Sequence, residues 1–137
     1  MKVVIMAGGK GTRIASVNSD VPKPMIPIDG KPILEYQINA LAAQGYCEII
    51  LIIGHLGHVI RDYFEDGSKW NVQISYIEEN TPLGTAGALF YLKEQIKDDF
   101  LLLNGDIIFD VDIRRFLAYH KAQGTMATIP DCGIAIA

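Results

Sequence analysis

Cysteine is scarce in this sequence: only Cys47 and Cys132 occur among 137 residues. Their separation fits neither a metal knuckle nor a disulfide framework, so both are expected to be ordinary reduced thiols. Long hydrophobic runs are absent as well, because no stretch reaches the roughly 18 apolar residues of a membrane span, and no signal-peptide pattern opens the chain. These absences predict a soluble, cytoplasmic protein without a membrane partner.

Basic charge is also in short supply. Twelve Lys and Arg residues face sixteen Asp and Glu residues, giving a formal net charge of −4 and an isoelectric point near 5.2. Binding to a nucleic-acid backbone needs a clustered excess of basic residues, so nucleic acid is not an expected partner. Half of the residues are hydrophobic, and no repeat or linker divides the chain, which predicts one domain over residues 1–137.

Short apolar runs alternate with stretches of helical periodicity. Strands are predicted at residues 2–6, 48–53, 72–77 and 100–103, with a fifth beginning near Thr125. Helices are predicted from Pro32 to Gly45, over residues 57–64 and 85–96, and onward from Asp112 as a capping residue. The alternation predicts a Rossmann-like, doubly wound α/β fold, in which helices on both faces of a mostly parallel sheet form three layers. Ligands are then expected at the carboxyl ends of the strands.

A glycine-rich loop follows the first predicted strand and consists of Ala7-Gly8-Gly9-Lys10-Gly11-Thr12-Arg13. Glycines allow backbone N–H groups to approach phosphate oxygens, and the Arg13 guanidinium could bind a triphosphate. The loop is not a well-registered dinucleotide-binding motif, and Gly30-Lys31 is followed by Pro32 and so is not a Walker A motif. The alternative is a tight turn with Arg13 in a surface salt bridge.

A family resemblance emerges from three segments in order: Gly8-Gly9-Lys10-Gly11-Thr12-Arg13, then Pro22-Lys23-Pro24-Met25, then Gly30-Lys31-Pro32. Together they resemble the signature of the sugar-phosphate nucleotidyltransferases. Residues 20–25 and 104–112 look most like mannose-1-phosphate and heptose-1-phosphate guanylyltransferases. The resemblance implies transfer of a nucleoside monophosphate from an NTP, with GTP favoured, to a sugar 1-phosphate, with release of pyrophosphate.

The resemblance also implies roles for individual residues. The loop residues Ala7, Gly8, Gly9, Gly11, Thr12 and Arg13 would bind the nucleotide phosphates, Lys23 would neutralise the reacting phosphates, and Asp106 would bind Mg²⁺. Physical reasoning supports two of these roles. Flanking prolines are expected to hold Lys23 in a stiff, extended segment, and Mg²⁺ is usually held by one or two carboxylates together with substrate phosphates. Seen alone, the lysine segment would be an ordinary surface loop.

A second matching block, residues 78–88, resembles the family's loop that enters a helix beneath the nucleoside. Gly84 would let the backbone approach the base. Glu79 aligns with a base-contacting position, and its carboxylate could accept hydrogen bonds from the N1–H and exocyclic amine of guanine. The alternative is that Glu79 is a solvated loop acid.

The C-terminal segment, residues 129–137, departs from the family pattern. Family members continue for about another hundred residues, as expected for a full-sized domain, so the sheet is predicted to be incomplete and the domain truncated. An exposed edge after the fifth strand would invite pairing with a second copy. Two rival interpretations are a nucleotide-binding or regulatory module without catalysis and a Rossmann-type oxidoreductase domain, which Pro22-Lys23-Pro24 disfavours.

Overall fold

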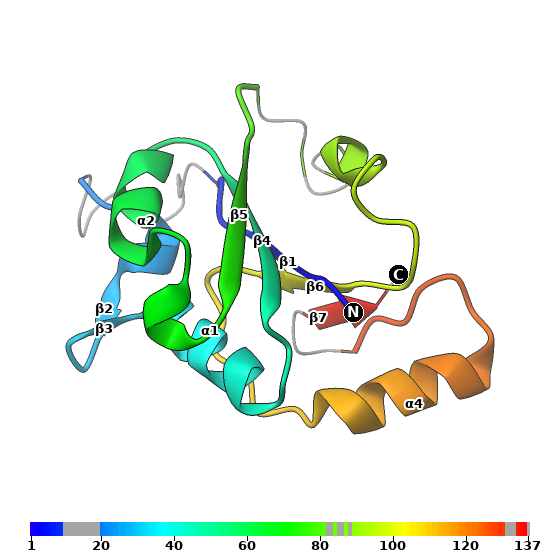
Figure 1. Ribbon diagram of the computed structural model, residues 1–137. Coiled ribbons are helices and arrows are strands. Elements are labelled where there is room, and N and C mark those ends of the chain that lie inside the picture. The colour runs from blue at the N-terminus through cyan, green and yellow to red at the C-terminus, as the bar shows by residue number, and fades with distance from the viewer. Residues whose placement is uncertain (10–19, 82–83, 85–86, 88, 131–133, 137) are drawn as a thin grey trace.

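The computed structural model describes residues 1–9, 20–81, 84, 87, 89–130 and 134–136. A five-stranded sheet of order β5-β4-β1-β6-β7 runs through its centre (Figure 1). The strands are β1 (Val3–Met6), β4 (Glu48–Ile53), β5 (Gln73–Glu78), β6 (Leu101–Asn104) and β7 (Ile134–Ile136). The first four run parallel, and β7 pairs antiparallel to β6. The prediction of a mostly parallel sheet with helices is confirmed.

The central strands are buried on both faces. Strand β4 pairs with β1 on one side and β5 on the other, and every residue of it after Glu48 is buried. Its unbroken apolar run is what a strand covered on both faces requires, because neither side alternates with solvent. The strands predicted at residues 2–6, 48–53, 72–77 and 100–103 are all present, with boundaries that agree within one residue.

Three α-helices contribute to the larger of two hydrophobic clusters: α1 (Ile33–Ala43), α2 (Gly57–Phe64) and α4 (Ile113–Gln123). Their buried apolar residues meet alternate residues of the strands; the helical members are Leu34, Ile38, Leu41, Ile60, Phe64 and Ile113. Each is at most 1% exposed. The longest of these helices has 11 residues, and no helix in the described part of the chain is long and apolar enough to cross a bilayer.

The second hydrophobic cluster contains Val4, Ile50 and Ile52, whose side chains lie against Leu92. Leu92 belongs to the 3-10 helix η4 (Leu89–Leu92). The prediction of an α-helix over residues 85–96 is wrong for residues 89–96, which form a 3-10 helix followed by turns. Leu89, Leu92 and Ile96 still pack against the second cluster, whereas Phe90 is 73% exposed.

The fifth strand also differs from the prediction. Residues 125–127 form no strand, and Thr128 makes only a single bridge, exchanging backbone hydrogen bonds of 2.9 and 3.0 Å with Ile136. The strand is β7, in which Ile134 and Ile136 are 0% exposed. The alternation Ile-Ala-Ile directs both isoleucines into the core, whereas Met126 is 94% exposed and has no such packing.

A small hairpin lies between β1 and α1. It comprises the 3-10 helix η2 (Lys23–Met25) and the short antiparallel strands β2 (Pro27–Ile28) and β3 (Lys31–Pro32). Asp29 and Gly30 connect the strands with φ angles of 51° and 82°, and a two-residue turn with both φ values positive matches the right-handed twist of the strands. Ile33 then donates a 3.2 Å backbone hydrogen bond to Ile26, which ties the hairpin to α1.

Asp112 caps α4 as predicted, because its Oδ1 accepts a 3.1 Å hydrogen bond from the backbone N–H of Arg115. We expect Asp112→Ala to lower the free energy of unfolding by about 1 kcal/mol, and Asp112→Asn to retain most of it. Urea denaturation of both variants measures the difference. The exposed Asp110 provides the control, and an Asp110→Ala loss as large as that of Asp112→Ala would contradict the capping role.

Candidate active site

The order in which the chain adds strands to the sheet reverses at β1. From β1 the chain proceeds to β4 and β5 on one side, and it then returns to β6 on the other side. In open α/β sheets the loops at such a reversal leave in opposite directions, and ligands bind in the crevice outside the carboxyl ends of the strands. The residues that follow β1 are Ala7 and Gly8, and those that follow β6 are Gly105 and Asp106. The fold therefore brings the predicted glycine loop and the predicted metal ligand Asp106 to one edge of the sheet.

Gly105 packs the β6 turn tightly against the end of β1. Its N–H donates a 2.9 Å hydrogen bond to the carbonyl oxygen of Met6. A Cβ at this position would lie 3.0 Å from that oxygen, 3.2 Å from Cγ of Pro24 and 3.3 Å from Cα of Ala7. Glycine is therefore needed here for close approach, and the contact with Pro24 brings the η2 segment to the same place.

Lys23 and Asp106 form an ion pair through Nζ and Oδ2, although 83 residues separate them in sequence. Their side chains are 36% and 32% exposed, so both charges lie partly open to solvent. The sequence predicted a phosphate-neutralising role for one residue and a metal-binding role for the other. The structure makes them direct neighbours, so an incoming phosphate or cation would meet both charges.

The backbone at Lys23 differs from the expected extended segment, because Lys23 begins the 3-10 helix η2. Met25 donates a 2.8 Å hydrogen bond to the carbonyl of Pro22, and Ile26 donates a 3.1 Å bond to that of Lys23. Pro24 lies in the first turn, where its missing N–H leaves no bond unmade. Pro24 and Met25 are buried, so the lysine is held by a short anchored helix.

Gly8 lies against Gly54, the residue that follows β4. A Cβ on Gly8 would be 3.1 Å from the backbone nitrogen of Gly54, and a Cβ on Gly54 would be only 2.7 Å from the carbonyl oxygen of Gly8. A Cβ built on Gly9, by contrast, has no atom of the described residues within 4 Å. Sequence reasoning missed Gly54; the available signal was a glycine directly after the buried run of residues 48–53.

The remaining predicted loop residues divide into two groups. Gly11, Thr12 and Arg13 lie outside the described residues. Gly84 is described: it is exposed and has a φ of 72°, a left-handed conformation that favours glycine. Within the described part of the chain, no atom lies within 4 Å of a Cβ built on Gly84.

The two acids at the end of β5 have different surroundings. Glu78 Oε1 forms an ion pair with Arg61 Nη2 at 2.8 Å, and this guanidinium also lies 5.2 Å from the ring centroid of Tyr76. Burial raises the pKa of Tyr76 to about 12, and its hydroxyl donates a 2.6 Å hydrogen bond to the carbonyl of Glu65. Glu79 instead lies toward the glycine loop, because its Oε2 is 3.3 Å from the position of a Cβ on Gly8.

A second residue that sequence reasoning missed is Gln37 of α1. Its side chain is buried, at 1% exposure, and Nε2 donates hydrogen bonds of 2.8 Å to the carbonyl of Asn104 and 2.5 Å to that of Ile107. The available signal was a polar residue between Leu34 and Leu41 on the apolar stripe of the helix. These bonds join α1 to the turn that contains Asp106.

The carboxylates available for a metal ion are few. No group of three or more His, Cys, Asp or Glu side chains in the described part of the chain could enclose a metal by itself. Mg²⁺ usually keeps several waters and is shared between one or two carboxylates and substrate phosphates, so a single partly exposed Asp106 fits this mode of binding.

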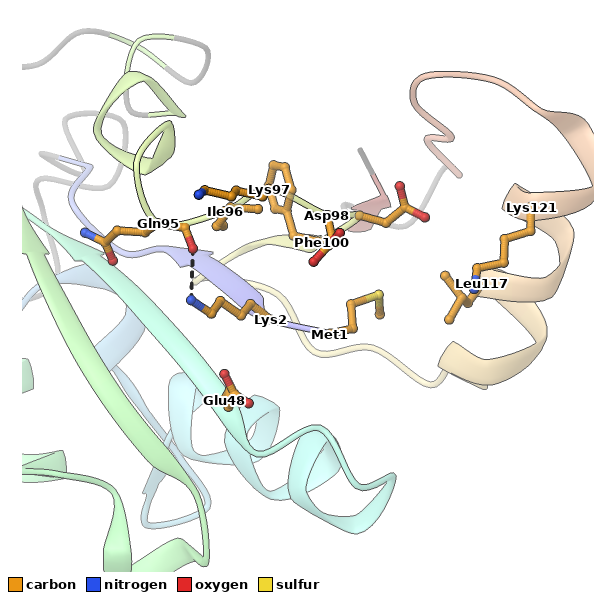
Figure 2. Close-up of a pocket in the computed structure, with 11 residues that line it drawn as sticks. Met1, Lys2, Glu48, Gln95, Ile96, Lys97, Asp98, Phe100, Leu117 and Lys121 are labelled. Carbon is orange, nitrogen blue, oxygen red and sulfur yellow. Dashed lines mark hydrogen bonds between the residues drawn. The ribbon is translucent and has the colours of Figure 1, made fainter.

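A hollow of about 1050 Å³ lies at the opposite edge of the sheet (Figure 2). It adjoins the amino ends of the strands, since its lining includes Lys2 before β1, Glu48 at the start of β4 and Phe100 before β6. Lys2 Nζ donates a 2.9 Å hydrogen bond to the carbonyl of Gln95 across it. The lining lysines are matched in number by acids, and no predicted site residue takes part.

Proteins of known activity match most of this chain. The profile described as Nucleotidyl transferase matches residues 2–132. A D-glycero-alpha-D-manno-heptose 1-phosphate guanylyltransferase of Campylobacter jejuni is 41% identical, and the match covers 84% of this chain and 52% of the relative. A UTP–glucose-1-phosphate uridylyltransferase of Synechocystis is 37% identical over 94% of this chain and 36% of the relative. The chain thus spans about half the length, or less, of these curated relatives.

A solved structure shares the fold. The crystal structure of HddC from Yersinia pseudotuberculosis complexed with GMP-PN superposes with a TM-score of 0.78 at 38% identity, covering 87% of this chain and 53% of that one. The strand order, with parallel neighbours on both sides of β1, defines a doubly wound α/β domain. Within that class, the chain belongs to the nucleotidyl transferase family, which confirms the resemblance seen in the sequence.

The contact between Gly8 and Gly54 generates a prediction. Gly54→Ala should force the carbonyl of Gly8 away from the end of β4 and lower the free energy of unfolding by about 1–3 kcal/mol, because the new methyl group overpacks the contact. Gly9→Ala, whose added Cβ meets no atom of the described residues, should change stability little. Thermal denaturation of the two variants provides the measurement, and equal losses would show that the close approach does not constrain this loop.

Proposed function

We propose that this chain forms the nucleotide-binding part of a sugar-1-phosphate nucleotidyltransferase, which joins a nucleoside monophosphate from an NTP to a sugar 1-phosphate and releases pyrophosphate. The observation that carries the proposal is the Lys23–Asp106 ion pair. It lies beside the glycine loop, at the edge of the sheet where the strand order reverses. Membership of the nucleotidyl transferase family supports it, as do the uridylyltransferase and guanylyltransferase activities of the two curated relatives.

The proposed reaction needs no covalent enzyme intermediate. A phosphate oxygen of the sugar 1-phosphate attacks the α-phosphorus in line, the new P–O bond forms, and the bond to the β-phosphate oxygen breaks. Pyrophosphate leaves with the electron pair, and because the nucleophile is already an anion, no general base is required. Catalysis then depends on positioning and on neutralising negative charge where phosphates converge.

Named residues would supply that neutralisation. The backbone of Gly8 and Gly9, together with Arg13, would bind the β- and γ-phosphates, and the Lys23 ammonium would face the α-phosphate and the incoming phosphate. Asp106 would hold Mg²⁺, which when bound supplies further positive charge against the phosphate oxygens. In the structure the partner of Lys23 is Asp106, so a cation at Asp106 would free the ammonium for phosphate.

Glu79 would select the base. Its carboxylate offers two acceptors, which match the N1–H and exocyclic amine of guanine, so GTP is the proposed nucleotide. Two observations support the assignment: Glu79 lies beside Gly8 at the end of β5, and the Yersinia pseudotuberculosis protein was crystallised in complex with GMP-PN.

A second candidate is a nucleotide-binding or regulatory module without catalysis. The specific observation in its favour is that the residues assigned above would bind the nucleotide, its phosphates or Mg²⁺, and none of the described residues is assigned to the sugar.

A pyrophosphate-release assay distinguishes the two candidates. The chain would be incubated with Mg²⁺, each of the four NTPs, and mannose, heptose or glucose 1-phosphate. We expect release that requires both substrates and is removed by chelation of the metal. Nucleotide binding without release would favour the module.

Substitution of Lys23 tests the residue assignment within that assay. Lys23→Ala should lower kcat by about a hundredfold or more, because charge developing on the phosphates loses its neighbour, while NTP binding weakens far less. Lys121→Ala, at the hollow on the opposite edge, is the control and should leave kcat unchanged. A fully active Lys23→Ala enzyme would contradict the proposed role of Lys23.

Base selection is tested by Glu79→Gln. The new amide presents a donor to the donors of guanine, so affinity for GTP should fall about tenfold or more relative to UTP. Glu78→Gln is a matched control, because it makes the same chemical change at the adjacent residue, whose carboxylate forms an ion pair with Arg61. Equilibrium titration with both nucleotides gives the ratio, and an unchanged ratio in Glu79→Gln would remove Glu79 from base recognition.

A further inference from the structure

We infer that Gln37 is a positioning residue, whose buried amide holds the β6 turn so that the Asp106 carboxylate faces the candidate site. The inference rests on the proposed function, in which Asp106 binds the metal. It concerns a residue of α1 that touches neither Lys23 nor Asp106 through any hydrogen bond given by the structure, and that acts through the backbone on either side of Asp106.

The two hydrogen bonds span the turn. Gln37 Nε2 donates to the carbonyl of Asn104 at 2.8 Å and to that of Ile107 at 2.5 Å. Asn104 is the last residue of β6, and Ile107 directly follows Asp106. A single amide therefore fixes both ends of a four-residue segment, and with both ends fixed the segment has little freedom to rotate the Asp106 side chain away.

The orientation of the amide is dictated by its partners. Both partners are carbonyl oxygens, which only accept, so the NH₂ group must face the turn. Gln37 Oε1 is buried and has no hydrogen-bond partner among the described residues. A flipped amide would set Oε1 against both carbonyls and lose both bonds. The turn thus requires two donors from one side chain, which an apolar residue of similar size could not supply.

The helix that carries Gln37 is well anchored. Leu34, Ile38 and Leu41 on α1 are each 0% exposed and belong to the main hydrophobic cluster. The amide consequently projects from a rigid element, and rigid support is what a side chain needs in order to fix a turn to within a fraction of an ångström.

Gln44 offers a matched control at the end of the same helix. It lies seven residues after Gln37 and also bonds to the backbone of the connection between β6 and α4. Its Nε2 donates to the carbonyl of Val111 at 3.0 Å, and its Oε1 accepts from the N–H of Ile113 at 2.9 Å. These bonds hold the distant end of the connection, where α4 begins. Loss of either glutamine should make the connection between β6 and α4 more mobile, but only loss of Gln37 should change the orientation of the Asp106 carboxylate.

The experiment compares Gln37→Met with Gln44→Met, two substitutions that keep the volume and remove the donors. Binding of Mn²⁺, a paramagnetic substitute for Mg²⁺, is titrated in the presence of GTP by its effect on water proton relaxation. We expect Gln37→Met to weaken Mn²⁺ binding about tenfold or more, because removing a group that orients a ligand has an effect of this size. Gln44→Met should stay within about twofold of the parent protein.

A second variant and a second readout keep the result interpretable. Gln37→Asn retains an amide that is one methylene shorter and reaches one carbonyl at most, so its Mn²⁺ affinity should be intermediate. The amide NMR signals of Gly105 and Asp106, recorded without nucleotide or metal, should shift in Gln37→Met and stay in place in Gln44→Met. Unmoved signals in Gln37→Met, or equal losses of affinity in both methionine variants, would overturn the inference.

Failure of the proposed function would look different. If the parent protein bound neither GTP nor Mn²⁺, the function would fail, but the NMR comparison would still report whether Gln37 fixes the turn. If the parent bound both and the Gly105 and Asp106 signals did not change in Gln37→Met, the function would stand and the positioning role would fail.

Discussion

The burial of β1 between two parallel neighbours is the constraint on which the other features depend. Val3, Val4 and Ile5 are each 0% exposed, and the strand pairs with β4 and β6 in the same register, from Val3 to Met6 on both sides. Because β1, β4 and β6 run parallel, the segments that follow their carboxyl ends meet at one edge of the sheet. Gly8, Gly54 and Asp106 come to the same edge for that reason, although they belong to distant parts of the chain.

Charge and packing are divided between different residues at this edge. Glycines at 8, 54 and 105 remove side chains where backbones approach within about van der Waals distance, and the charged Lys23 and Asp106 remain partly exposed. The tight contacts fix where the charges lie, and the exposure leaves them available to a ligand. An enzyme that moves phosphoryl groups depends mainly on such preorganised charge, since reorganisation during the reaction would raise its barrier.

Sequence patterns predicted the features that arise locally. The buried run of residues 48–53, the Asp112 cap and the helix over 57–64 each follow from neighbours in the chain, and all three are confirmed. The fifth strand was misplaced because the buried Ile-Ala-Ile segment pairs with β6, whereas residues 125–127 are exposed and form no strand. Gln37 and Gln44 were missed because their partners are backbone groups more than sixty residues away, which no side-chain motif reports.

The pairing of β1 also has a consequence during synthesis. Strand β1 is translated before both of its partners, of which one begins at Glu48 and the other only at Leu101. A nascent chain therefore carries an apolar strand whose second edge stays open until β6 has left the ribosome, and such edges are templates for association with other chains. Ribosome-associated chaperones, or slow translation between β5 and β6, would act on this interval.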